Sequence, residues 1–229
     1  MIRALLDLAC PRRCPGCGER GVLLCAECTG GVLGVPFRAD PTPRPAGLPQ
    51  VFAATAYDGP ARAALIAFKE RGRLALAGPL GAALAGVVAG MRADFVVAVP
   101  SSRAARRERG YDHMSLLAKQ VAALTGVPIA TGLGQHRRVA DQSGLDSAGR
   151  ARNITGSMRY AARRGCQPNG RVVLLDDIVT SGATLLEATR ALRAAGIEVS
   201  AAAVVAATQR RFQDRAPSPF PPVRDSLGP

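Results

Sequence analysis

The chain has no tryptophan and few aromatic residues of any kind. Aromatic side chains make up 4% of its 229 residues, whereas hydrophobic residues as a whole make up 48%. The core must therefore be built mostly from alanine, valine and leucine. A disordered chain is excluded, because it would hold far fewer apolar residues. The length allows one sizeable α/β core with an accessory piece.

Negative charge is also scarce. Aspartate and glutamate number 17 against 30 lysines and arginines, which gives a net charge of +13. Such a surface attracts phosphate groups, nucleic acid or acidic lipid, although an arginine-rich face that contacts only water is the plainer alternative. The two histidines, His113 and His136, are expected at the surface or against phosphate rather than as proton shuttles.

The sequence offers no convincing export signal or membrane span. The first ten residues hold a short apolar patch interrupted by Asp7, which is too brief for the apolar region of a signal peptide. The uncharged run from Leu74 to Met91 reaches the lower length limit of a membrane span, but it contains Pro79 and four glycines and is mainly alanine. We therefore predict a helix packed on a sheet there, and a cytoplasmic protein without membrane insertion.

Cysteines gather near the start of the chain, which holds five of the six. Two Cys-x-x-Cys motifs separated by seven residues contain Cys14, Cys17, Cys25 and Cys28. In a chain without an export signal, this spacing predicts a structural zinc site rather than disulfides, with free or redox thiols as the alternative. Residues 1–34 are then a small zinc-binding module that the metal stabilises, because such a fold has little core of its own. The roles of Cys10 and Cys166 stay open.

The rest of the chain divides by composition. Residues 35–50 are dense in proline and are predicted to be a linker, since proline cannot continue a helix or the interior of a sheet. From residue 51 to 208, apolar strand-like runs alternate with helical ones. This pattern predicts an α/β domain with a parallel sheet covered by helices on both faces. Residues 209–229 are rich in proline and charge and are predicted to be a disordered tail.

Two adjacent acids, Asp176 and Asp177, follow an apolar run and precede the turn Val179–Thr184. In an open α/β sheet, ligands bind beyond the carboxyl ends of the strands. The turn offers hydroxyls, backbone N–H groups around Gly182 and the start of a helix, which together favour a phosphate. Because carboxylates would repel a bare phosphate, we expect a ligand that carries a diol beside its phosphate, such as ribose 5-phosphate.

Other interpretations of this turn are weaker. The sequence has no G-x-x-x-x-G-K-[ST] motif of a nucleoside-triphosphate site, and no G-x-G-x-x-G lies at a predicted strand-to-helix turn. An ordinary strand-to-helix turn with a capping residue is the structural alternative.

The segment DDIVTSGATL resembles the phosphoribosyl-pyrophosphate binding motif of type I phosphoribosyltransferases. Other matching segments are YDGPARAALIAFKERGR, VPSSRAARRERGYDH and RRVADQSGLDSAGRARN. Together with the cysteine module, they make residues 10 to 208 resemble the ComF family, which is linked to competence and DNA uptake. The resemblance implies an α/β fold of the type I phosphoribosyltransferase class, with helices flanking a parallel sheet. It also implies binding of phosphoribosyl pyrophosphate with Mg2+.

The resemblance assigns roles to individual residues. The ribose would be held by the two acids, Asp176 and Asp177. The pyrophosphate would face the loop of Pro100, Ser101, Ser102 and Arg103. The 5′ phosphate would be wrapped by Val179, Thr180, Ser181, Gly182, Ala183 and Thr184. Further family positions are matched by Lys69, Arg107, Arg109, Gln142, Arg150 and Asn153. The family's usual RGFNQ reads RGYDH here, with Asp112 and His113 in place of an amide pair.

Two functional hypotheses follow. The first is a transferase that passes phosphoribosyl to an unidentified nitrogen acceptor, with Mg2+ neutralising the leaving group. The second is a non-catalytic competence factor that binds single-stranded DNA, with the zinc module docking other competence proteins. Its basis is two arginine groups in predicted loops, with Arg103, Arg106, Arg107 and Arg109 in one loop and Arg137, Arg138, Arg150 and Arg152 in the next. Few aromatics are available to stack on bases, and DNA binding alone would not need the acidic pair.

Overall fold

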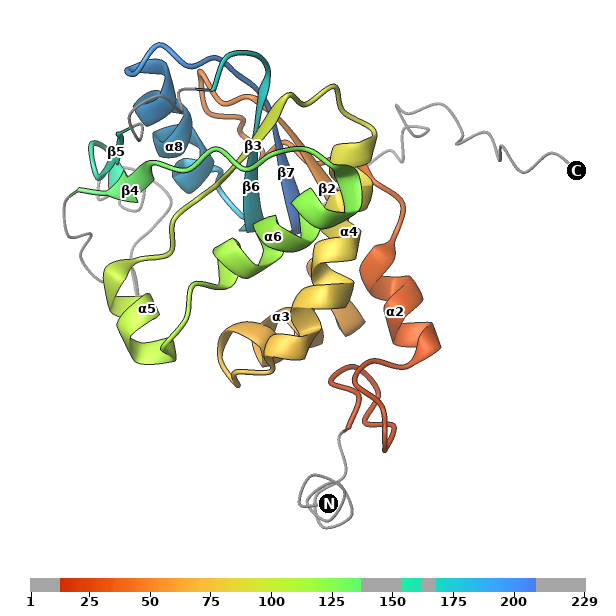
Figure 1. Ribbon diagram of the computed structural model, residues 1–229. Coiled ribbons are helices and arrows are strands. Elements are labelled where there is room, and N and C mark those ends of the chain that lie inside the picture. The colour runs from red at the N-terminus through yellow and green to blue at the C-terminus, as the bar shows by residue number, and fades with distance from the viewer. Residues whose placement is uncertain (1–12, 137–153, 162–167, 209–229) are drawn as a thin grey trace, which may run out of the picture.

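The computed structural model describes residues 13–136, 154–161 and 168–208. They contain a five-stranded sheet in the order β1-β2-β7-β6-β3 (Figure 1). The strands are β1 Phe37–Arg38, β2 Gln50–Ala56, β3 Phe95–Ala98, β6 Val172–Val179 and β7 Val199–Ala207. Neighbours from β2 to β3 pair in parallel, and the edge strand β1 pairs antiparallel with β2. The predicted α/β fold with a mostly parallel sheet is confirmed.

Helices cover both faces of this sheet (Figure 1). On one face lie α3 Gly59–Lys69, α4 Ala77–Ala89 and α6 His113–Thr125, and on the other lies α8 Ala183–Arg193. Side chains of β6 alternate between the two layers, with Val173 and Leu175 packed in the first and Val172 and Leu174 in the second. Burial on both faces explains why this strand is apolar at every position before its acids.

A small sheet of β4 Leu133–Gln135 and β5 Met158–Tyr160 packs beside α8. Near the start of the described chain, α2 Ala26–Leu33 follows the cysteine motifs and contacts α3 and α4. The accessory elements therefore sit at opposite sides of the main sheet, with the small sheet against α8 and α2 against the other helical layer (Figure 1).

The alanine-rich run from residue 74 to 91 forms a buried helix, as predicted. The short 3-10 helix η1 Leu74–Leu76 leads directly into α4, and Leu80, Leu84 and Val87 are fully buried in the core. Pro79 occupies the first turn of α4, where backbone N–H groups have no partner within the helix to lose. Among the described residues, no helix combines the length and apolar character that crossing a membrane requires.

The proline-rich segment 35–50 is more ordered than the linker prediction suggested. It contributes β1 to the edge of the sheet, and Asp40 accepts a hydrogen bond from the backbone N–H of Val51 at 3.0 Å. Ala39 and Leu48 are buried in the core layer that contains α8. The segment therefore joins the cysteine motifs to the main domain while packing closely against that domain.

The arginine-rich segment after β3 forms a helix, whereas the sequence predicted a loop. Residues Arg103–Arg109 form a helix, α5. Ser102 caps its start by accepting from the N–H of Ala105 at 3.0 Å, and Gly110 ends it with a left-handed φ of 76°. The capping residues explain this helix, which has no apolar stripe to indicate it.

Candidate functional site

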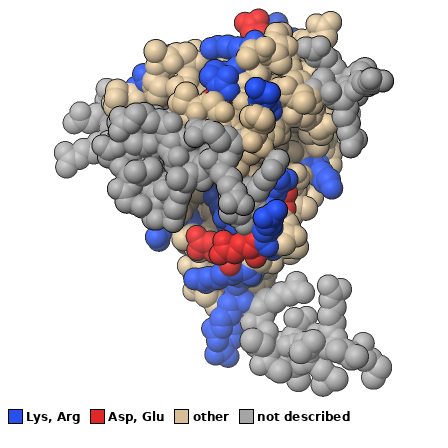
Figure 2. Space-filling model, turned by 90° about the vertical axis from the view of Figure 1, so that its left-hand side faces the viewer, with Lys and Arg blue, Asp and Glu red and all other residues tan. Residues whose placement is uncertain are grey.

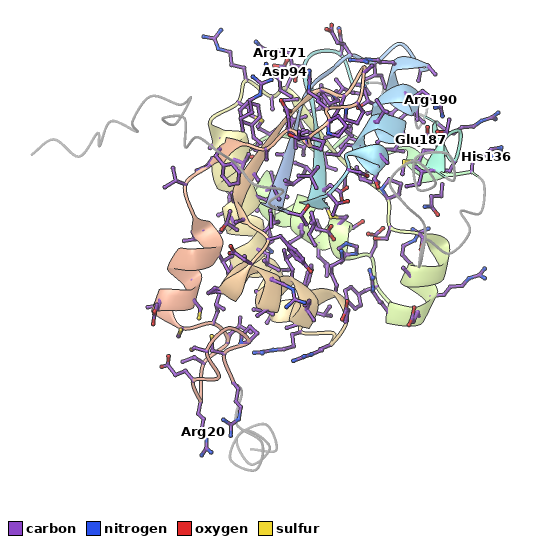
Figure 3. The ribbon with its side chains drawn as sticks, turned by 180° about the vertical axis from the view of Figure 1, so that it is seen from behind. Arg20, Asp94, His136, Arg171, Glu187 and Arg190 are labelled. Atoms are coloured by element: carbon purple, nitrogen blue, oxygen red, sulfur yellow. The ribbon has the colours of Figure 1, made fainter. Side chains whose placement is uncertain are left out.

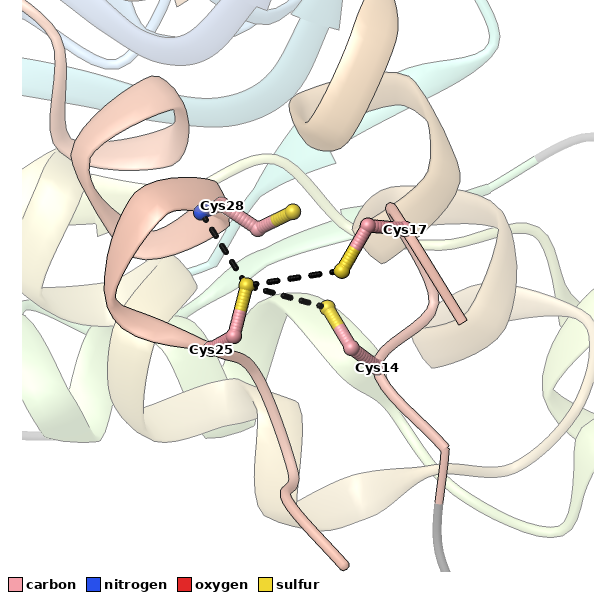
Figure 4. A group of neighbouring side chains, drawn as sticks. All are labelled: Cys14, Cys17, Cys25 and Cys28. Atoms are coloured by element: carbon pink, nitrogen blue, oxygen red, sulfur yellow. Dashed lines mark hydrogen bonds between the residues drawn. The ribbon is translucent and has the colours of Figure 1, made fainter. Parts of the chain in front are cut away.

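The four cysteines of the two motifs lie together at one end of the molecule (Figure 4). The Sγ atom of Cys25 is 3.8 Å from that of Cys14 and 3.5 Å from that of Cys17, and all four Sγ atoms lie within 4.8 Å of one another. Thiolates at about 2.3 Å from a tetrahedral ion stand about 3.8 Å apart. The predicted ligands are therefore brought together in an arrangement that could hold a metal ion such as zinc.

Hydrogen bonds favour the thiolate form at Cys14, whereas burial and the neighbouring thiols raise the pKa of Cys28. Burial raises the pKa of Cys14, but the backbone N–H groups of Cys17, Cys25 and Gly16 outweigh it and lower this pKa to about 6. None of the described cysteines forms a disulfide. The spacing of the four thiols could therefore hold a metal ion.

The cysteine cluster rests on the amino-terminal end of α3. A Cβ atom on Gly16 would meet Sγ of Cys28 at 2.6 Å and Cα of Pro60 at 3.4 Å, so this contact leaves room only for glycine. Beyond the other end of α3, Arg73 donates to the carbonyl oxygen of Arg13 at 2.7 Å. The helix that carries Lys69 is thus tied directly to the cysteine cluster.

A second group of polar residues surrounds Asp177 on β6. Asp177 is 5% exposed, and its Oδ2 atom lies 2.7 Å from the ammonium of Lys69 at the end of α3. The same oxygen lies 2.6 Å from Nε2 of His113, the first residue of α6. A buried carboxylate is strongly unfavourable unless it is paired and hydrogen-bonded. Two partners from two different helices meet this requirement.

His113 extends the group to the loop after β3 and to α5. Its Nδ1 atom lies 3.0 Å from Oγ of Ser101 and 3.2 Å from Nη1 of Arg109. Ser101 also hydrogen-bonds Oδ1 of Asp112, the N-cap residue of α6, at 3.2 Å. The expected surface position of His113 is wrong, since its exposure is 5%, whereas the alternative of a contact with phosphate stays a prediction.

The two neighbouring acids differ in charge. Burial raises the pKa of Asp176 to about 8, and the charge of Asp177 adds to this shift. Burial acts on Asp177 too, but the Lys69 charge and the hydrogen bond from His113 outweigh it and hold the pKa of Asp177 below its usual range. Near neutral pH the pair therefore carries roughly one negative charge, located on Asp177.

The turn Thr180–Gly182 joins β6 to α8 beside these acids. Gly182 has a φ of 76°, and a Cβ there would meet Cδ2 of Leu48 at 3.0 Å and Cγ of Pro41 at 3.1 Å. The position therefore favours glycine for both its backbone conformation and its space. No side chain of the described residues caps α8, so the N–H groups of its first turn can bind an anion.

Basic side chains of α5 lie next to this group. Arg106 and Arg107 are exposed, and they line a shallow hollow of about 510 Å³ together with Gly110, Tyr111 and Asp112. Figure 2 views this side of the molecule and shows Lys and Arg side chains in separate groups, with acidic side chains between some of them. The visible positive charge does not form one continuous track.

Another buried acid, Glu187 on α8, belongs to a separate contact (Figure 3). Its Oε1 atom accepts from the N–H of Met158 at 2.8 Å, and Arg190 donates both to Glu187 and to the carbonyl oxygen of Met158. Burial opposes ionisation, but Arg190 holds the pKa of Glu187 below its usual range. This acid fastens β5 to α8 and is a structural residue.

The structure brings together several of the residues proposed from sequence. Lys69, Asp176, Asp177, Ser101 and Arg109 meet at the carboxyl ends of β3 and β6. Pro100 and Ser102 belong to the loop that leads into α5, where Arg107 faces solvent. The described residues do not include Gln142, Arg150 and Asn153, nor the side chain of Arg103. The sequence indicated His113 only as a departure from the RGFNQ pattern.

Comparison with known proteins agrees with this geometry. A family model for the phosphoribosyl transferase domain matches residues 116–219, a range that contains β6, the glycine turn and α8. The chain is 29% identical over 106 residues to Competence protein F of Haemophilus influenzae. These matches support a ComF-type protein with a phosphoribosyltransferase-like domain. The match to Competence protein F covers 46% of this chain and 46% of that relative, so the chain spans about half the length of the relative.

Stability of the folded chain should depend on pH through Asp176. Its pKa is about 8 in the folded state and 3.8 in its ordinary environment. At a pH between these two pKa values, the folded state retains a proton that the unfolded chain releases. Ionisation of Asp176 therefore lowers the free energy of unfolding as pH rises, by an amount on the order of a few kcal/mol. Asp176→Asn removes this loss and keeps the acceptor oxygen that bonds the N–H of Asp177.

We expect urea unfolding to show that Asp176→Asn is more stable than wild type, by a margin that grows from pH 5 to pH 8. Asp177 does not produce this trend, because its lowered pKa makes its contribution constant above its ordinary pKa. A margin that is the same at both pH values would contradict the assignment of a raised pKa to Asp176.

Proposed function

We propose that this chain binds phosphoribosyl pyrophosphate with Mg2+ at the carboxyl ends of β3 and β6. The proposal is carried by the ionised, buried Asp177, which lies beside a second carboxyl group and just before a glycine turn that opens a helix. Hydroxyls of a ribose can donate to the acids, while the 5′ phosphate accepts from the N–H groups of the turn. The match to the phosphoribosyl transferase domain supports the same ligand.

The other candidate residues would contact different phosphate groups of this ligand. Thr180 is exposed and Ser181 and Thr184 are partly exposed, so their hydroxyls are available to the 5′ phosphate. The loop Pro100–Ser102 would face the pyrophosphate, and Arg109 would contribute positive charge to that side. The proposed ligand thus uses the ends of two neighbouring parallel strands, which is where α/β sheets bind their ligands.

The proposed reaction is transfer of the phosphoribosyl group to a nitrogen acceptor. A C1–N bond forms while the bond from C1 to the pyrophosphate oxygen breaks, the electron pair leaves with pyrophosphate, and the acceptor's proton goes to solvent. Mg2+, when bound with the substrate, would supply positive charge that neutralises the leaving group. The chain's own residues orient the sugar and place fixed charges around it, and Lys69 keeps Asp177 ionised for this purpose.

Single-stranded DNA binding is the second candidate function. The observation in its favour is α5, on which Arg106 and Arg107 are exposed beside a shallow hollow. Arginines of this kind bind phosphates without regard to base sequence, and such binding weakens steeply with salt. The described residues do not include the second arginine group of this candidate, Arg137, Arg138, Arg150 and Arg152.

For the cysteine cluster we propose a structural zinc ion. Four sulfur ligands at tetrahedral spacing leave no position for substrate, which is typical of structural rather than catalytic zinc. Residues 1–34 would then form a metal-stabilised module that packs on α3 and precedes, in the sequence, a ligand-binding domain at residues 51–208. The face of this module away from α3 is the proposed contact for other competence proteins.

The zinc proposal is tested by the metal content of the purified protein. We expect about one zinc per wild-type chain by mass spectrometry of the metal, and a loss of most of it in Cys28→Ser, because one of four thiolates is removed. Cys166→Ser is the matched control, since this cysteine lies outside both motifs. Zinc retained in full by Cys28→Ser would contradict the proposed site.

Ligand binding is tested by calorimetric titration of phosphoribosyl pyrophosphate with Mg2+. Asp177→Asn keeps the side-chain shape but removes the charge, and we expect affinity to fall by about a hundredfold. Asp94→Asn is the matched control, because Asp94 is an exposed acid paired with Arg171 just before the amino end of β3. Equal affinities for wild type and Asp177→Asn would overturn the proposal.

The same proteins separate the two candidate functions when a single-stranded oligonucleotide replaces the sugar ligand. Under the phosphoribosyl proposal, Asp177→Asn leaves oligonucleotide binding unchanged. An oligonucleotide affinity that falls with added salt and on joint replacement of Arg106 and Arg107 by alanine supports the DNA-binding candidate. An oligonucleotide affinity that changes neither with added salt nor on replacement of the two arginines excludes the DNA-binding candidate.

A further inference from the structure

The contact between His113 and Asp177 has a geometry that specifies its hydrogen atoms. Nη1 of Arg109 lies 3.2 Å from Nδ1 of the imidazole, and a guanidinium can only donate. With Arg109 as the donor of this contact, Nδ1 is the acceptor and the ring hydrogen lies on Nε2. That N–H points to Oδ2 of Asp177 at 2.6 Å. Ser101, 3.0 Å from Nδ1, has one hydroxyl hydrogen, which it can donate either to Nδ1 or to Oδ1 of Asp112.

The partners of Asp177 all lie on one of its two oxygens. Lys69 and His113 both contact Oδ2. Among the described residues, no hydrogen bond to Oδ1 is seen. Two contacts from different directions on one carboxylate oxygen fix the plane of the group. The second oxygen then keeps one orientation, in which it can accept a hydrogen bond from a ligand hydroxyl.

Lys69 cannot fix this orientation alone. Its side chain is 23% exposed, and an ammonium on a flexible four-carbon stem acts as a point charge without a preferred plane. The imidazole is rigid and buried, and it packs edge-on against the ring of Phe68, with centroids 6.2 Å apart and planes at 76°. The direction of the His113 bond is therefore set by packing as well as by its partners on the Nδ1 side.

We propose that His113 is a positioning residue for Asp177, holding Oδ2 so that Oδ1 is presented to a hydroxyl of the ribose. This role rests on the proposed function of the site. It also connects the acid to Ser101 and Arg109, which lie on the pyrophosphate side, so that both parts of the ligand meet a single hydrogen-bonded network. A buried histidine that only fills space in the core would have none of these consequences for binding.

Two substitutions separate hydrogen bonding from packing. His113→Phe keeps an aromatic ring but removes the N–H, whereas His113→Gln keeps an N–H donor, as the amide of the RGFNQ pattern does. In full-length protein titrated with phosphoribosyl pyrophosphate and Mg2+, we expect His113→Phe to lose about tenfold or more in affinity and His113→Gln to stay within about threefold of wild type. His136→Phe is the control, because His136 is the other histidine and is exposed.

Nitrogen NMR of the imidazole adds a measurement that does not depend on the ligand. In ligand-free wild type we expect the Nε2–H tautomer for His113, and a changed Nε2 signal in Asp177→Asn, with the His136 signal unaffected. A hydrogen found on Nδ1 would overturn the proposal. Circular dichroism shows whether His113→Phe is folded. If that variant is unfolded, the affinity of His113→Gln and the NMR signals test the proposal without it.

The outcomes distinguish this role from the proposed function itself. If wild type binds the ligand and His113→Phe binds equally well, the positioning role is wrong while the function stands. If His113→Gln is as weak as His113→Phe, the ring rather than its N–H matters, and the role is again wrong. If wild type shows no binding, the proposed function fails and this role fails with it, even where NMR shows the predicted tautomer.

Discussion

A buried negative charge on Asp177 constrains how the surrounding elements meet. The charge is tolerated because Lys69 at the end of α3 and His113 at the start of α6 both contact it. Both contacts require the two helices to approach the carboxyl end of β6 from the same face of the sheet. The arrangement also raises the pKa of the neighbouring Asp176, so one pair of identical side chains contains one charged and one largely neutral acid.

The cysteine cluster is connected to this charge through a single helix. It packs on Pro60 in the first turn of α3, Arg73 beyond the end of α3 bonds back toward it, and Lys69 stands at the last position of the helix. A small cluster with little core of its own is therefore well placed to fix the helix that supplies the cation for Asp177. The cysteine cluster and the acidic site are thus linked physically as well as by sequence order.

Local patterns could be predicted from the sequence, whereas long-range contacts could not. The acids, the glycine turn and the paired cysteines are each contained in a short window. The role of His113 depends on a partner 64 residues away, and no local signal distinguishes it from a surface histidine. Helix α5 was missed because Ser102 and Gly110 define it rather than an apolar stripe. The order of segment 35–50 comes from the burial of Ala39 and Leu48, which tertiary packing decides.

The central claim is that the acids on β6 and the turn after them hold one ribose phosphate. The most direct measurement is a crystal structure of the chain with phosphoribosyl pyrophosphate and Mg2+. We predict that the ribose hydroxyls lie within hydrogen-bonding distance of Asp176 and Asp177 and that the 5′ phosphate accepts from the N–H groups of residues 180–184. A ligand bound elsewhere, with these acids contacted only by Lys69 and His113, would contradict the account.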